Sequence, residues 1–218
     1  MSEVNATFKA HVGSAAYVGN QDVTPRAGKG GELLTADLNA PYYQATKDGQ
    51  VYHAVTVGAG VAHNVDAEGT TWDVALNNPA GSGVDLVIIE ARCTRGTTGD
   101  IGPGAVVWMR PASATSTVPT GTAMPVSSGL IGANAANKAQ ALYTVTVEGT
   151  DGVRMRYAFE LNENVLATAG TPATSAVSDR VDGQIIVPPG YYVGLTGEGD
   201  AGAAPLLHLS LSWKEVPV

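Results

Sequence analysis

The chain has 218 residues, one cysteine and a formal net charge of −8, and only 15% of its residues are charged. A single cysteine excludes an internal disulfide, and an acidic chain whose Lys and Arg residues are spread singly is poorly suited to binding nucleic acid directly. The sequence contains no apolar run that could span a membrane, and its first residues lack the features of a signal peptide. We therefore expect no membrane partner and synthesis in a cytoplasm.

The N-terminal part of the chain shows no sustained hydrophobic periodicity. Its run GNQDVTPRAGKGGELLTADLNAPYY (19–43) is rich in Gly, Asn, Asp and Pro, which favour turns and extended chain. A loop of this length is uncommon in a compact domain unless it has a function or lies on a neighbouring molecule. We predict an extended N-terminal arm or loop over residues 1–50, followed by one β domain over residues 51–218.

From Val51 onward the chain consists of short runs typical of strands. Residues 51–57, 71–76 and 104–109 are predicted strands, and the second should place Trp72, Val74 and Leu76 on one face. Residues 84–93 are apolar on both faces, which predicts a central strand that buries Cys93. Glu90 in this run either pairs with an arginine, lies at the strand edge, or is a catalytic carboxylate with a raised pKa.

The middle of the chain contains two weak segments and a predicted hairpin. Residues 111–129 are small, polar and interrupted by proline, so we expect an exposed loop, and residues 133–142 form a short helix or a loop. Residues 142–148 and 153–161 alternate and flank a short Gly/Asp loop, which predicts a β-hairpin. In its second strand Val153, Met155, Tyr157, Phe159 and Leu161 should face inward.

The C-terminal region predicts three further strands, at residues 183–188, 191–195 and 207–213. The last, LHLSLSW, alternates strictly between apolar and polar residues. Tyr191 and Tyr192 point to opposite faces of one strand. Either one ring is covered by the core and the other by a second copy of the chain, or one ring is exposed. These elements predict an all-β fold: an antiparallel β-sandwich of jelly-roll type with an extended N-terminal arm, and an immunoglobulin-like sandwich as the alternative.

No motif in the sequence specifies a reaction. The four histidines are scattered, and His208 on the polar face of the last strand is either solvated or at a subunit contact. Residues 64–73 resemble a calcium loop in part, but Ala75 stands where the closing glutamate is needed. The glycines at 28–31 fail the phosphate-loop pattern, and no G-x-S-x-G motif is present. We expect no catalytic residue, no metal and no cofactor, and therefore not an enzyme.

The two ends of the chain resemble a family of structural proteins. Residues 24–60, with Gly28-Lys29-Gly30, Leu38, Tyr42-Tyr43 and the strand start at Gly49–Ala54, resemble the opening of small virion proteins of tailed bacteriophages. The ending, IIVPPGYYVGL followed by LSLSWKEVPV, is similar to the closing hairpin of phage jelly-roll proteins.

The resemblance implies a capsid decoration (cement) protein. Such a protein is made in the host cytoplasm, forms a homotrimer, and binds the major capsid protein on the outer face of the phage head. The arm would lie along neighbouring subunits, and weak contacts would add up through multivalency. The candidate interface residues are Gly28, Lys29, Leu38, Tyr42, Tyr43, Tyr191, Tyr192 and His208.

The alternative function is a tail-fibre or spike head domain that binds a bacterial surface glycan. Such a domain should present aromatic and acidic residues together at loop tips. Trp72, Asp73 and Trp108 are the candidates for that role.

Overall fold

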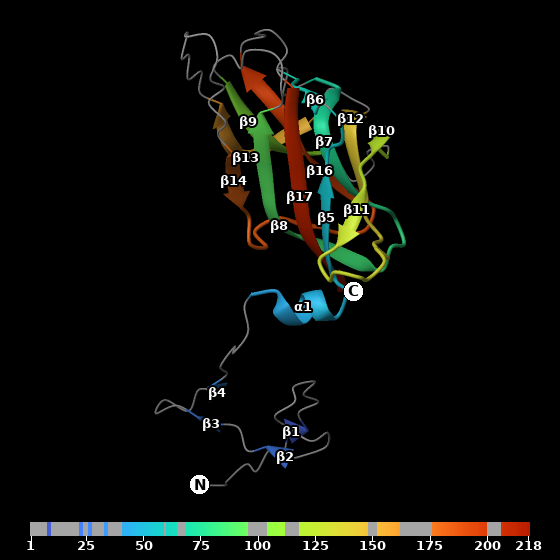
Figure 1. Ribbon diagram of the computed structural model, residues 1–218, viewed down its shortest axis with the longest axis vertical. Coiled ribbons are helices and arrows are strands. Elements are labelled where there is room, and N and C mark those ends of the chain that lie inside the picture. Colours follow the sequence, from blue (N-terminus) through green and yellow to red (C-terminus); the bar gives the residue numbers. More distant parts are fainter. Residues whose placement is uncertain are drawn as a thin grey trace. The chain divides into compact units, whose positions relative to one another are not determined.

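The computed structural model describes residues 8–9, 22–23, 26–27, 33–34, 41–58, 60–64, 69–95, 104–111, 118–147, 152–161, 176–199 and 206–218 (Figure 1). The chain divides into two units, Met1–Pro41 and Tyr42–Val218. In the first unit, β1 (Phe8–Lys9) pairs with β2 (Asp22–Val23), and β3 (Arg26–Ala27) pairs with β4 (Leu33–Leu34). Residues 42–50, which the sequence assigned to the arm, belong to the second unit, called the body below.

The body contains two antiparallel sheets. The six-stranded sheet has the order β10-β12-β7-β16-β9-β13. Its strands are β10 (Thr120–Ala123), β12 (Gln140–Thr146), β7 (Thr71–Asn78), β16 (Tyr191–Gly199), β9 (Gly104–Pro111) and β13 (Gly152–Leu161).

The seven-stranded sheet has the order β11-β5-β17-β8-β14, with β15 also paired to β8 and β6 to β17. Its strands are β11 (Val126–Ser128), β5 (Val51–Val55), β17 (Leu206–Pro217), β8 (Val84–Arg95), β14 (Ala176–Arg180), β15 (Ile186–Val187) and β6 (Val61–Ala62). The predicted central strand over residues 84–93 is confirmed, because β8 is paired on both sides by β17 and β14.

The strand order confirms the predicted jelly roll. Eight principal strands, taken in chain order, are β5, β7, β8, β9, β13, β14, β16 and β17, and they form the orders 1-8-3-6 and 2-7-4-5 in the two sheets. First and last strands lie side by side, as in a double Greek key, whereas an immunoglobulin sandwich groups its strands A-B-E-D and C-F-G. The segment β10–β12 is inserted between the fourth and fifth principal strands and adds an edge strand to each sheet.

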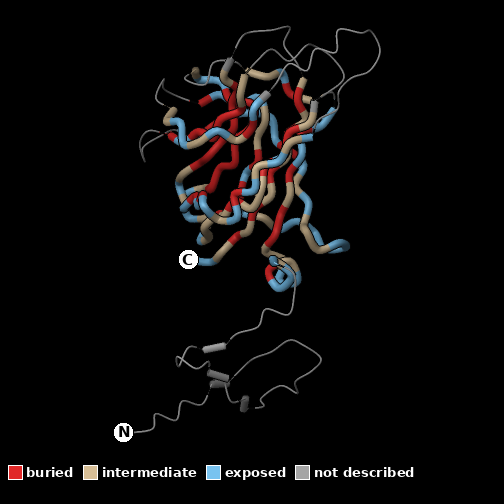
Figure 2. Tube along the Cα trace, turned by 90° about the vertical axis from the view of Figure 1, so that its left-hand side faces the viewer, coloured by how far each residue is buried: buried red, intermediate tan, exposed pale blue. Residues whose placement is uncertain are grey.

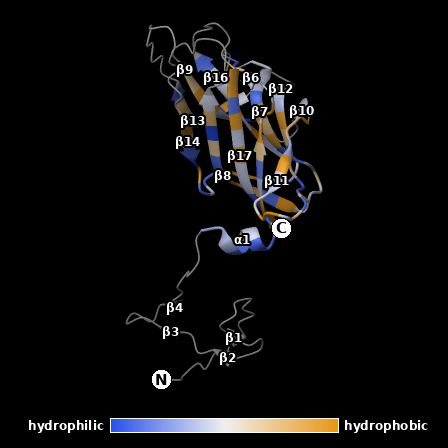
Figure 3. Ribbon diagram, in the orientation of Figure 1, coloured by the Kyte–Doolittle hydropathy of each residue, from blue (hydrophilic) through white to orange (hydrophobic). Residues whose placement is uncertain are grey.

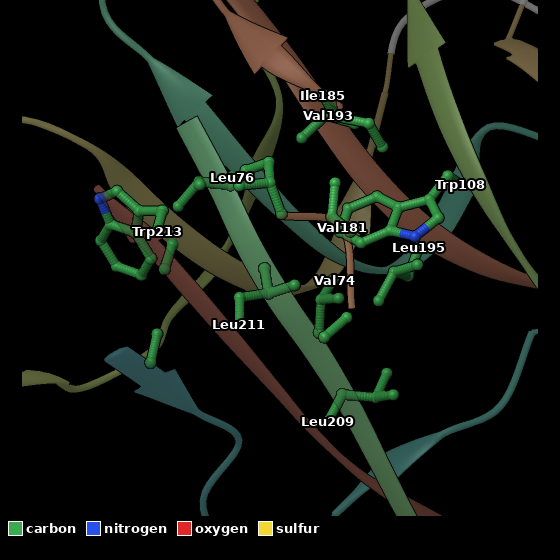
Figure 4. Close-up of a cluster of buried hydrophobic side chains, with 14 of the residues drawn as sticks. Val74, Leu76, Trp108, Val181, Ile185, Val193, Leu195, Leu209, Leu211 and Trp213 are labelled. Carbon is green, nitrogen blue, oxygen red and sulfur yellow. The ribbon is translucent and has the colours of Figure 1, made fainter. Parts of the chain in front are cut away.

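The main core lies between the two sheets. Along β17, buried and half-exposed residues alternate from Leu206 to Val216, so the predicted two-residue period is confirmed. The buried residues of the body, red in Figure 2, and the hydrophobic ones, orange in Figure 3, lie along its strands. Leu209, Leu211 and Trp213 of this strand point toward Val74 and Leu76 of the opposite sheet (Figure 4). Each fully buried side chain of this kind contributes about 1.5–3 kcal/mol to folding.

A second buried cluster lies on the outer face of the six-stranded sheet. It contains Trp72, whose ring centroid is 5.5 Å from that of Tyr192, together with Val107 and Met109, which alternate with core residues of β9. The expectation that Trp72 shares a face with Val74 and Leu76 is therefore wrong. The alternation breaks between Trp72 and Val74, opposite Thr144, whose φ is 50°. Gly194 leaves room for the indole on the outer face, since a Cβ there would lie 2.5 Å from Cε3 of Trp72.

The predicted hairpin over residues 142–161 is also wrong. Strand β12 pairs with β7 and strand β13 with β9, so the two runs lie at different places in the same sheet. Two register shifts in β13, between Arg154 and Arg156 and between Tyr157 and Phe159, break its alternation. Met155 and Tyr157 are consequently 40% and 64% exposed, although their spacing predicted burial.

The two weak segments have different outcomes. For residues 133–142 the sequence left a short helix or a loop open, and the structure shows no helix at residues 133–139, with β12 beginning at Gln140. The stretch has no apolar stripe with which a helix could pack. The predicted loop over residues 111–129 includes β10 and β11. One helix was not foreseen: α1 (Tyr43–Lys47), which buries Ala45. No helix in the described part of the chain is long and apolar enough to cross a membrane.

Candidate functional site

Two of the candidate interface residues lie where the body begins. The hydroxyl of Tyr42 donates a hydrogen bond to Oδ1 of Asp182 over 2.9 Å, and its carbonyl accepts from the amide of Thr46 at the start of α1. Tyr42 has a φ of 69°, which costs a non-glycine residue energy and has to be compensated by contacts such as these. Partial burial, followed by the hydrogen bond to Asp182, raises the pKa of the phenol. Tyr42 is therefore anchored within the body, while Tyr43 beside it is 47% exposed.

Three other candidates, Gly28, Lys29 and Leu38, lie outside the described residues. Their predicted role in contacts between subunits stays a prediction.

The two adjacent tyrosines of β16 occupy different environments. Tyr192 is only 5% exposed and belongs to the outer-face cluster with Trp72. Tyr191 is half-buried against the main core and lines a groove of about 220 Å³. Met155, Ile186 and Arg110 line the same groove. The chain itself therefore covers the ring of Tyr192. Tyr191 is the ring that keeps access to solvent.

His208 lies on the outer face of the seven-stranded sheet, where short polar side chains form rows across the strands. One row consists of Ser127, His53, Ser212, Glu90 and Arg180. His208 lies opposite Thr94, beyond a second row that contains Ser210, Arg92 and Ser178. Nδ1 of His53 lies 2.8 Å from Oγ of Ser212. Burial, and then the charge of Arg92, lowers the pKa of His53.

Glu90, on the same face, is bound to an arginine. Its Oε2 accepts a hydrogen bond from Nη2 of Arg92 over 2.9 Å. Of the three roles that the sequence left open for Glu90, the structure therefore supports pairing with an arginine.

One pair of side chains in the body, His63 and Asp73, resembles part of a catalytic site but is closed to solvent. Nδ1 of His63 lies 2.9 Å from Oδ2 of Asp73, and Oδ1 of Asp73 accepts the amide of Asn64 over 2.7 Å. Their side chains are 5% and 1% exposed, and burial raises the pKa of Asp73. Gly197 leaves the space for this pair, since a Cβ there would lie 2.1 Å from Cε1 of His63. A substrate cannot reach a dyad enclosed in this way, so the pair holds β6 onto the body.

A further polar network closes the side of the sandwich where β13 and β14 lie. Nε1 of Trp108 donates to Oδ2 of Asp179 over 2.8 Å, and Arg156 pairs with Oδ1 of the same carboxylate. Asp179 is on the seven-stranded sheet, and both partners are on the six-stranded sheet. The carboxylate therefore joins the two layers.

The residues proposed for glycan binding are not at the surface. Trp72 and Asp73 are 1% exposed and Trp108 is 0% exposed. Rings that stack on a sugar have to be accessible to it. These three side chains lie in the interior of the body instead.

Within the described ranges, no group of three or more His, Cys, Asp and Glu residues is arranged to hold a metal ion. Asn64 and Asp73 of the calcium-like segment are described, whereas its residues 65–68 are not. Cys93 is buried as predicted, and burial raises the pKa of its thiol to about 12, so it is poorly suited to act as a nucleophile.

Sequence reasoning missed one surface feature, the side of the body formed by β10 and β11. Val118 is 58% exposed and Ile131 is 99% exposed, and a hollow of about 480 Å³ lies beside β10. The signal was present in the sequence, because no residue from Pro111 to Asn137 carries a charge. We interpreted that stretch only as an exposed loop.

Comparison with known proteins yields little. No family of known proteins and no curated protein matches this sequence. Among solved structures, a chain of the structure described as "KBV activated particle at acidic pH" is similar, with 9% sequence identity and a TM-score of 0.22. The match covers 100% of this chain and 90% of that chain. A TM-score this low carries no argument about the function of the protein.

Proposed function

We propose that this chain is a capsid decoration (cement) protein of a tailed bacteriophage. It binds the outer face of the head through the major capsid protein, and it stabilises the shell through trimeric and arm-mediated contacts. In this role the protein is made in the host cytoplasm and ends on the exterior of the virion.

The observation that carries the proposal is the division of the chain into a jelly-roll body and a separate N-terminal unit. Jelly rolls recur in viral capsid and lectin domains, where a rigid sandwich presents surfaces for contact. Tyr42, the first residue of the body, is held within the body by Asp182 and by the amide of Thr46.

The interior of the body supports a structural role over a catalytic one. The buried His63–Asp73 pair, the Asp179 network and the Cys93 thiol all act inside the sandwich. A body that keeps its reactive groups closed off acts through its surfaces. Body and N-terminal unit would then be two linked binding modules, and linkage raises the total affinity although each contact is weak.

The proposal is tested by mixing the purified full-length chain with empty heads that lack it. We expect the chain to sediment with the heads and to raise the temperature at which they break open. Tyr42→Phe removes the hydroxyl that binds Asp182 at a candidate interface residue, so it should bind more weakly while its own unfolding temperature changes little. Tyr157→Phe removes an exposed hydroxyl from β13 and is the matched control.

Failure of the chain to bind heads, together with binding to a bacterial surface polysaccharide, would reject the proposal in favour of a tail-fibre domain.

A further inference from the structure

The two sides of the sandwich along which its edge strands lie differ in charge. The edge strands β10 and β11 lie on one side, and β13 and β14 lie on the other (Figure 1). The β13–β14 side carries Arg154, Arg156, Glu160, Asp179 and Arg180. The β10–β11 side belongs to the stretch from Pro111 to Asn137, which contains no charged residue and no histidine.

The uncharged side also exposes apolar surface. Val118 and Ile131 are 58% and 99% exposed, and all four residues of β10 are exposed. Beside β10 lies the hollow of about 480 Å³, whose lining includes Pro119, Ala123 and Met124. The same surface therefore has an exposed apolar side chain and, next to it, a hollow that could receive such a side chain. We call the segment Val118–Ile131 the uncharged edge.

We infer that the uncharged edge is the contact between two copies of this chain. Two copies of net charge −8 repel each other, so they can approach closely only where no like charges are brought together. A two-fold axis presents the same surface patch of both copies to one another, so residue i of one copy meets residue j of the other, and j meets i. On the β13–β14 side such an axis would bring one set of charged side chains against a second copy of that set, whereas the uncharged edge brings none.

The shape of the uncharged edge supports the same inference. Val118 directly precedes Pro119, one of the residues that line the hollow, so a two-fold contact brings each Val118 toward the hollow of the other copy. The same patch then supplies a projecting side chain and a recess on both copies, which is the requirement for a closed two-fold interface. The edge strand β10 is also short and interrupted by a register shift at Gly121, features that discourage open-ended strand addition. The contact therefore stops at two copies.

This contact is independent of shell binding and of any three-fold contact, because it uses a different surface from the candidate residues Tyr42, Tyr191 and His208. The contact joins copies of the chain in pairs. Its loss therefore halves the mass of the assembly in solution, whatever other contacts are present.

The test is the mass of the full-length protein in solution, measured by sedimentation velocity and light scattering at submillimolar concentration. Val118→Asp places a carboxylate on the uncharged edge, and we expect the mass to fall by a factor of two. Thr122→Lys, which puts a charge on exposed β10, should have the same effect. Because both side chains are exposed, circular dichroism and the unfolding temperature should match those of the parent protein.

The control is Tyr157→Asp, which introduces the same charge at an exposed residue of β13 and should leave the mass unchanged. The inference is overturned if the parent protein has the mass of one chain, or if neither edge variant lowers the mass. It is equally overturned if Tyr157→Asp halves the mass and Val118→Asp does not. None of these outcomes depends on whether the protein binds a phage head.

Discussion

Carboxylates with little exposure to solvent fix parts of the body that strand pairing alone does not hold. Asp73 anchors His63 and Asn64 beside β6, Asp179 joins the two sheets, and Glu215 accepts amides from residues 138 and 139. A buried carboxylate is tolerated only when its oxygens have partners, and each of these has at least two. Spacing along the chain could not reveal these pairs, because their members are distant in sequence or lie on different strands.

The His63–Asp73 pair predicts a large stability cost for one histidine and a small one for another. His63→Ala leaves the Asp73 carboxylate buried without its ring partner, and we expect a loss of about 3–5 kcal/mol in the free energy of unfolding. His208→Ala is the matched control, since that ring is half-exposed on a polar face, and the expected change is within about 0.5 kcal/mol. Urea unfolding of both variants measures the difference. Equal costs for the two substitutions would show that the pair does not hold β6.

The Cys93 thiol predicts a reactivity and a pH dependence. With a folded pKa of about 12 against about 8.5 in the unfolded chain, the thiol should resist Ellman's reagent at pH 8 and react fully once the protein is unfolded. A pKa raised by folding contributes stability below the unfolded value, and this stability is lost as the pH rises through the folded value. Above the unfolded pKa, Cys93 should reduce the free energy of unfolding by about 1.4 kcal/mol per pH unit, compared with Cys93→Ala. Rapid labelling of the native protein would contradict the burial.

At the scale of elements, local pattern predicted strands well and their partners poorly. The run at 207–213 became β17 with the predicted faces, and the run at 84–93 became the central strand β8. Whether a strand forms depends on the alternation of apolar and polar side chains over a few residues, and a single sequence shows that alternation. The hairpin over residues 142–161 failed because pairing in a jelly roll joins strands far apart in the chain, and a Gly/Asp loop does not encode that choice. The two shifts in β13 likewise depend on β9, so Met155 and Tyr157 were misplaced.

The connection between β11 and β12 is held to the last strand by one side chain. The Glu215 oxygens accept the amide of Lys138 at 2.8 and 3.0 Å and that of Ala139 at 3.0 Å, and Glu215 is 6% exposed. Glu215→Ala leaves these donors unsatisfied, and the expected loss of stability is roughly 3 kcal/mol, at about 1–3 kcal/mol for each buried donor. Hydrogen exchange at Ala139 should accelerate more than exchange in β8.

Glu215→Gln is the conservative comparison, since its amide oxygen can still accept one of these hydrogen bonds. It should fall between the parent protein and Glu215→Ala. Unchanged exchange at Ala139 in the alanine variant would show that the connection is held by other contacts.

At the scale of the whole molecule, charge and layering separate three surfaces with different uses. The uncharged edge, the charged β13–β14 side and the polar outer face of the seven-stranded sheet each have their own chemistry. The uncharged stretch from Pro111 to Asn137 is visible in the sequence. Only the fold shows that β10 and β11 of this stretch lie together along one side of the sandwich. The aromatic candidates for glycan binding failed for the reverse reason. The sequence left Trp72 and Trp108 as candidate surface rings, but Gly194 leaves space for Trp72 inside the body, and Asp179 accepts the hydrogen bond of the buried Trp108.

The proposed role is tested most directly by a cryo-electron microscopy reconstruction of empty phage heads incubated with the full-length chain. We predict added density on the outer face of the head that fits the two-sheet body formed by Tyr42–Val218, with further density leading from Tyr42 toward a neighbouring subunit. Heads that remain bare, or density confined to the tail, would contradict the assignment to the capsid.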